Sequence, residues 1–212
     1  MPGIARDTLE TFRQKIESFN SSYVEDWNAF IGAHPSARPA ELGRVLRRWQ
    51  ACRPNKMRRD AASALHQAPY LDDLISAAAP HIEALSTFDI ASPASFETAA
   101  FTTALAHLWN VFEQLSYQGS VRDGLAGSVG ISKAVMLVTS GRVGPAFDSE
   151  VSRALKVGKI NDFAQWHNAL AIVNADIQAF QQANKISFSE AKPPRFANLN
   201  NGRAYDMALG PR

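Results

Sequence analysis

Apolar residues recur every three or four positions along most of this chain, the spacing of one face of an α-helix. The first apolar stripe consists of Leu9, Phe12, Ile16, Phe19, Tyr23, Trp27 and Phe30. It ends at the stretch "GAHPSARP", where one glycine and two prolines interrupt the pattern. We therefore expect one long helix from about residue 9 to residue 31.

A second apolar face follows at Leu42, Val45, Leu46 and Trp49. At 100° per residue, three arginines fall on the opposite side of the same helix: Arg44, Arg47 and Arg48. The pattern predicts that the tryptophan belongs to the core and that the arginines point to solvent. Four more basic residues, Arg53, Lys56, Arg58 and Arg59, extend this basic stripe, and a short helix is expected over residues 56–67.

The strongest helical pattern lies between residues 92 and 115. Ser92 is a favourable N-cap and Pro93 suits a first helical turn. The apolar positions are Phe101, Leu105, Leu108, Phe112 and Leu115. This segment is predicted to be the central core helix.

Further helices are expected over residues 132–139, 145–155 and 161–183. The final segment, 186–212, contains prolines, asparagines and glycines, which are typical of a coil. We expect it to be extended and packed on the body or on a partner, and a homodimer formed through this segment is one possible arrangement. No strand pattern is found. The predicted fold is an all-α, single-domain helical bundle over residues 1–185 with this C-terminal extension.

Composition excludes several kinds of site. Cys52 is the only cysteine, which rules out an internal disulfide and any multi-cysteine metal centre. The five histidines lack metal-ligand spacing, and no nucleotide-binding loop is present, so no metal and no cofactor are expected. The charged N-terminus and the lack of a long apolar run predict a cytoplasmic protein without a membrane partner. The net charge of +2 does not by itself indicate nucleic acid.

Residues 125–153 contain a glycine-rich turn, an apolar helix, a second glycine and an aspartate before a further helix. The positions that form this order are Leu125, Gly127, Val129, Gly130, Ser132, Lys133, Ala134, Gly141 and Asp148. This order resembles the core of the helix-hairpin-helix DNA glycosylase superfamily. The resemblance implies that the amides of the turn hold a DNA phosphate and that Asp148 stabilises positive charge as an N-glycosidic bond breaks. Ser132 occupies the place of the lysine nucleophile of bifunctional members, which implies an enzyme without lyase activity.

A second resemblance has slightly better spacing. The sequence is similar to a little-studied group of bacterial proteins, with which it shares three short sequence segments. The likeness assigns no activity to that group. The pieces here are Ser132-Lys133, the segment Pro145 to Ser149 around Asp148, and Arg203-Ala204-Tyr205-Asp206-Met207-Ala208-Leu209. This likeness keeps the fold but weakens the expectation of catalysis.

Each candidate residue also has an ordinary structural explanation. Asp148 is either catalytic or a helix cap, and Ser132 is either a phosphate contact or the N-cap of a helix that begins at Lys133. Lys133 either contacts phosphate or is a solvated surface residue. Arg44, Arg47 and Arg48 either follow a nucleic-acid backbone or form a solvated face.

Two functions therefore stay open. The first is double-stranded DNA binding with a base-excision site, in which Asp148 is the catalytic group. Gly127, Gly130, Ser132, Lys133, Arg44, Arg47 and Arg48 are then the nucleic-acid-binding residues. The alternative is a non-catalytic interaction or scaffold protein with no nucleic-acid role. A deep polar pocket beside Asp148 would favour the enzyme, and a capping Asp148 would favour the alternative.

Overall fold

The computed structural model describes residues 3–51, 70–115 and 125–211. These ranges are helical and contain no β-strand, which confirms the all-α prediction. The α-helices are α1 (Leu9–Glu17), α2 (Ser21–Gly32), α3 (Arg38–Arg48), α4 (Tyr70–Ala84), α5 (Ala94–Glu97), α6 (Ala99–Phe112), α7 (Ser128–Val138), α8 (Ser149–Leu155), α9 (Phe163–Asn184), α10 (Phe188–Ala191) and α11 (Asn201–Leu209). Short 3₁₀ turns occupy Pro35–Ala37, Glu113–Leu115 and Pro194–Phe196.

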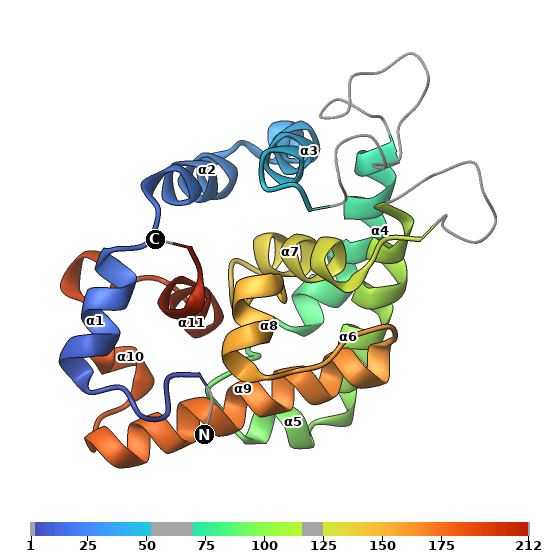
Figure 1. Cartoon of the computed structure of the whole chain (residues 1–212). Coiled ribbons are helices and arrows are strands. Elements are labelled where there is room, and N and C mark those ends of the chain that lie inside the picture. The colour runs from blue at the N-terminus through green and yellow to red at the C-terminus, as the bar shows by residue number, and fades with distance from the viewer. Residues whose placement is uncertain (1–2, 52–69, 116–124, 212) are drawn as a thin grey trace.

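The helices surround α7 and α8, which lie near the middle of the molecule (Figure 1). Helix α9 runs along one side, α4 and α6 pack against each other on a second side, and α1 packs against α11 on a third. The buried apolar side chains belong to one connected core. On α9 this core includes Leu170, Val173, Ile177 and Phe180.

The first apolar stripe is divided between two helices, so the prediction of one long helix was wrong. The break is at Asn20, whose side chain accepts a hydrogen bond from the backbone N–H of Ser22 and caps α2. The stripe nevertheless faces the core on both sides of the break, and Phe12, Ile16 and Trp27 are buried. Apolar spacing located the buried face, whereas cap chemistry decided the helix boundary.

The predicted helix from residue 92 is also divided. Thr98 is extended and separates α5 from α6, and the first helical residue is Ala94, with Pro93 in the N-cap position in place of Ser92. Leu105, Leu108 and Phe112 are buried, as their spacing predicts. Helix α6 contacts α4, α7 and α9, but it lies on one side of the molecule beside α4, and α7 occupies the central position that was expected of α6.

The C-terminal segment is not the extended coil that its composition suggested. It contains α10, a 3₁₀ turn and α11, and residues 201–208 are all buried. Helix α11 contacts α1 and α8 of the same chain. The segment is therefore part of the folded body. Helix α11 buries Arg203 and Asp206, so its buried face does not show the apolar periodicity by which the other helices were predicted.

Other sequence-based predictions lie outside the described residues. These are the helix over 56–67 and the extension of the basic stripe through Arg53, Lys56, Arg58 and Arg59.

Helices α4 and α6 bring two imidazole rings together. His81 and His107 stack with their ring centroids 4.4 Å apart and an interplanar angle of 14°. Burial, and then the neighbouring His107, hold the pKa of His81 below its ordinary value of 6.5. Because the folded state binds this proton less readily than the unfolded chain, His81 contributes stability above about pH 6.5 that is lost as the pH falls through its lowered pKa.

We expect urea unfolding at pH 7.5 and pH 5.5 to show a smaller loss of stability on acidification in His81→Gln than in wild type. Comparing the two proteins cancels the contributions of other titrating groups. An identical pH dependence in both would contradict the proposed coupling.

Candidate functional site

Residues of α7 and of the segment that leads into α8 meet the distant helix α11 around one small cavity. Asp206 on α11 accepts a hydrogen bond from the backbone N–H of Ala146 (3.0 Å) and forms an ion pair with Arg203 (2.6 Å). Ser132 on α7 accepts a hydrogen bond from the backbone N–H of Phe147 (2.9 Å). We call Lys133, Asp148, Arg203 and Asp206, which border the same small cavity, the polar cluster.

Arg203 is the most deeply buried charge of the polar cluster, with 1% of its surface exposed. Its guanidinium lies over three aromatic rings, those of Phe19, Trp27 and Trp49, at 5.0, 4.8 and 5.6 Å from the ring centroids. Burial lowers the pKa of Arg203 and raises the pKa of Asp206, and in both cases the attraction between the partners opposes the shift. The aromatic faces and the carboxylate together compensate a cation that has lost its water.

Lys133 is not solvated at the surface, which was one of the two interpretations of the sequence. It is buried in α7, and its ammonium donates a hydrogen bond to the backbone carbonyl of Trp49 (2.7 Å). Ser132 is not the N-cap either, because α7 begins four residues earlier, at Ser128, after Gly127. Gly130 is buried inside the same helix, whereas Gly127 is exposed. Of these four predicted phosphate-binding residues, only Gly127 lies at the surface.

Asp148 is the N-cap of α8. Its Oδ1 accepts hydrogen bonds from the backbone N–H groups of Glu150 (3.0 Å) and Val151 (3.1 Å). The side chain also borders the cavity of the polar cluster, together with Tyr23 and Trp49. This space measures about 10 Å³, roughly the room of one water molecule. The carboxylate thus caps the N-terminus of α8 and faces very little open volume.

Loss of this cap gives a direct prediction. Asp148→Ala is expected to lower the free energy of unfolding by about 0.5–2 kcal/mol, because two backbone N–H groups lose their acceptor. Asp148→Ser restores an acceptor and should recover most of the loss in urea unfolding. A gain of stability in Asp148→Ala would contradict the cap, since that result is typical of a carboxylate held in a strained catalytic position.

The predicted basic face is partly neutralised by acidic neighbours. Arg44 pairs with Asp26 (2.9 Å) and with Glu41, and Arg48 pairs with the same Asp26 (3.2 Å). Asp26 also accepts a hydrogen bond from the indole N–H of Trp49 (3.1 Å), which is buried as its spacing predicted. The hydrogen bond to Glu41 is the main reason that the pKa of Arg44 is raised. Arg47 is exposed.

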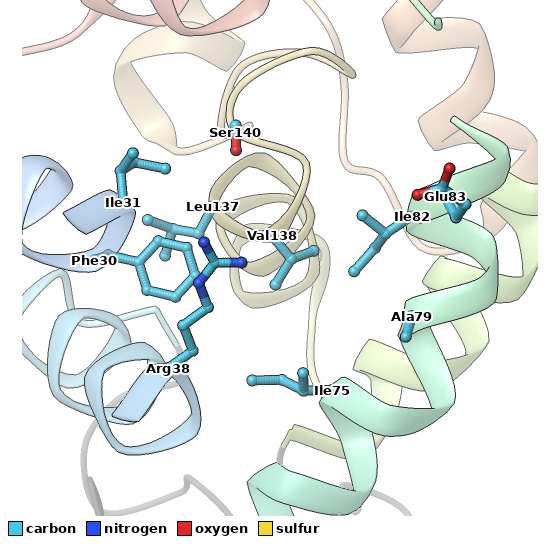
Figure 2. A pocket seen from close by; sticks show the side chains of 10 residues that line it. All are labelled: Phe30, Ile31, Arg38, Ile75, Ala79, Ile82, Glu83, Leu137, Val138 and Ser140. Carbon is cyan, nitrogen blue, oxygen red and sulfur yellow. The ribbon is translucent and has the colours of Figure 1, made fainter. Parts of the chain in front are cut away.

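An apolar pocket that the sequence did not indicate opens between α2, α3, α4 and α7. Its volume is about 210 Å³, and Figure 2 shows it close by. The residues that line it are Phe30, Ile31, Arg38, Ile75, Ala79, Ile82, Glu83, Leu137, Val138 and Ser140. Sequence reasoning missed it because it depends on α4, which was not predicted, and on the meeting of four separate helices.

Comparisons with protein-family models, with curated proteins and with solved structures gave no match. Across the described ranges, no group of three or more His, Cys, Asp or Glu side chains could hold a metal ion. None of the helices in those ranges is both long and apolar enough to cross a membrane. The function must therefore be argued from the geometry of this chain.

Proposed function

We propose that this chain is a non-catalytic interaction protein, and that its polar cluster holds α11 against α7 and α8. The observation that carries the proposal is the use of Asp148: one carboxylate oxygen caps α8, and the adjoining space is about 10 Å³. Pockets that hold small molecules are commonly on the order of 300–1,000 Å³. A nucleic-acid base would need several buried side chains to move before it could reach this carboxylate.

The interior hydrogen bonds support the same conclusion. Asp206 receives the N–H of Ala146, Ser132 receives the N–H of Phe147, and Lys133 donates to the carbonyl of Trp49. These side chains satisfy backbone groups that burial would otherwise leave without partners, which is a structural role. Ser132, Lys133 and Asp206, which belong to the pieces shared with the bacterial group, thus each have a structural role that requires no substrate.

A titration with labelled duplex DNA tests this function. One duplex carries an abasic-site analogue and the other is undamaged, and each is measured at about 50 and 200 mM salt, where phosphate contacts would change affinity strongly. We expect no preference for the lesion and no difference between wild type and Asp148→Asn. A lesion preference that disappears in Asp148→Asn would refute the proposal.

The second candidate is double-stranded DNA binding with base excision at Asp148. One observation favours it: the half-buried carboxylate shares its cavity with the rings of Tyr23 and Trp49, on which a base could stack if the cavity opened. Gly127, Gly130, Ser132, Lys133, Arg44, Arg47 and Arg48 would then be the DNA-binding residues.

Single-turnover incubation with duplexes that contain uracil or 8-oxoguanine, followed by hot alkali, would detect excision as strand cleavage. Cleavage by wild type that is absent in Asp148→Asn would establish this candidate, and its absence leaves the interaction protein. The predicted cytoplasmic location and the homodimer through the C-terminal segment remain separate proposals, and α11 itself is occupied by contacts within the chain.

A further inference from the structure

We infer that the surface around Ile31 on α2 binds an acidic, amphipathic segment of a partner protein. This inference rests on the proposed function and specifies where the interaction occurs and what chemistry the partner brings. It depends on three features of the described residues: two adjoining pockets, an exposed apolar side chain that borders both, and two arginines without ion pairs.

Ile31 borders two cavities. One is the 210 Å³ pocket between α2, α3, α4 and α7, and the other, about 350 Å³, lies between α2 and the C-terminal stretch that includes Phe196 and Met207. The side chain of Ile31 is 37% exposed, and among the described residues only it and Leu125 are large, exposed hydrophobic side chains. The two cavities therefore meet at one exposed apolar side chain, which a bound segment would cover.

The charges around these cavities favour an acidic partner. Arg38 enters the first pocket from the start of α3, and Arg195 borders the second (Figure 2 shows the first). Neither arginine forms an ion pair with any residue that the structure describes. Glu83 lies across the first pocket from Arg38, and the second pocket has no acidic lining residue. Carboxylates of a bound segment would complement both guanidinium groups.

The size of the first pocket favours the side chain of a peptide over a cofactor. The first pocket is smaller than the pockets that usually hold a small molecule, but it can receive one large apolar side chain. Two such hollows on either side of Ile31 suit two apolar anchors of one segment, as in the recognition of an amphipathic helix by a groove. Acidic residues between or beside these anchors would meet Arg38 and Arg195.

Selection from a phage-displayed library of random 16-residue peptides on immobilised wild-type protein tests the inference. Synthetic versions of the enriched peptides are then titrated by fluorescence anisotropy against wild type, Ile31→Asp, and Leu125→Asp as the matched control. We expect peptides with large apolar and acidic residues, a loss of affinity of at least about tenfold in Ile31→Asp, and no change in Leu125→Asp. Arg38→Glu and Arg195→Glu should each weaken binding severalfold, whereas Arg47→Glu should not.

Circular dichroism of each variant establishes that it is folded before affinity is compared. Peptides that bind Ile31→Asp as well as wild type, enriched peptides that are basic, or a failure to enrich any peptide would overturn the inference. Peptide binding at another surface would leave the interaction function intact, while excision of a damaged base that requires Asp148 would remove that function itself. The two failures are thus distinguishable.

Discussion

Replacing Arg203 by alanine is expected to lower the free energy of unfolding by about 3–5 kcal/mol. The guanidinium is 1% exposed, pairs with Asp206 at 2.6 Å and lies over three aromatic rings. Its removal leaves a buried carboxylate without its cation and a cavity beside Trp27. Urea unfolding followed by tryptophan fluorescence measures the loss, and Arg195→Ala, a change at an exposed arginine, should stay within about 0.5 kcal/mol of wild type.

A double variant tests whether the loss comes from the unpaired carboxylate and the cavity that Arg203→Ala leaves behind. Arg203→Met with Asp206→Asn fills much of the volume and removes both charges, while asparagine can still accept the hydrogen bond from Ala146. Because a buried ion pair replaced by neutral groups of similar shape is often tolerated, the double variant should be more stable than Arg203→Ala. Equal stabilities would contradict the view that the unpaired carboxylate of Asp206 and the cavity cause much of the loss in Arg203→Ala.

The second large effect is expected at Asp176 on α9. Its carboxylate accepts hydrogen bonds from the backbone N–H groups of Ile4 (2.7 Å) and Ala5 (3.1 Å) and from the hydroxyl of Tyr205 (2.7 Å). One side chain therefore fastens the N-terminal segment and α11 to α9. A Cβ atom added at Gly3, where φ is +78°, would lie 2.2 Å from Asp176 Oδ2, which shows how closely the N-terminal segment approaches.

Asp176→Ala leaves three donors without their acceptor, and a buried unsatisfied donor costs about 1–3 kcal/mol. We expect a total loss of at least about 3 kcal/mol in urea unfolding. Tyr205→Phe removes only one of these hydrogen bonds and should cost about 0.5–1.5 kcal/mol. A loss in Asp176→Ala no greater than that in Tyr205→Phe would contradict the role of Asp176 as a shared acceptor.

Apolar periodicity predicted the buried faces well where neighbouring helices cover a single stripe. Leu42, Val45 and Leu46 on α3 and Leu105 and Leu108 on α6 are buried as expected. Helix boundaries were less accessible to this reasoning, because they depend on local hydrogen bonds, such as the cap at Asn20, that interrupt an otherwise continuous stripe. The pattern therefore shows which side of a helix is buried better than where the helix ends.

The polar cluster shows a different limit of sequence reasoning. The two resemblances grouped Ser132, Lys133, Asp148, Arg203 and Asp206 as residues of interest, and the first and last of these are indeed linked through the backbone of residues 146 and 147. The burial of Lys133, Arg203 and Asp206 could not be predicted, because a charged side chain enters a core only when tertiary partners compensate it. The same compensation concealed α11, whose inward polar residues made the segment look like a coil.

The most direct test of the central claim, that the space beside Asp148 is filled by the protein itself, uses the fluorescence of 2-aminopurine. The 2-aminopurine is placed next to a lesion in a duplex, where stacking quenches its fluorescence. Extrusion of a base into a protein pocket disturbs this stacking and raises the fluorescence. With increasing protein, we predict no change in fluorescence for wild type or for Asp148→Asn. A saturable rise with wild type that is altered in Asp148→Asn would show a base entering this site, and would contradict the account.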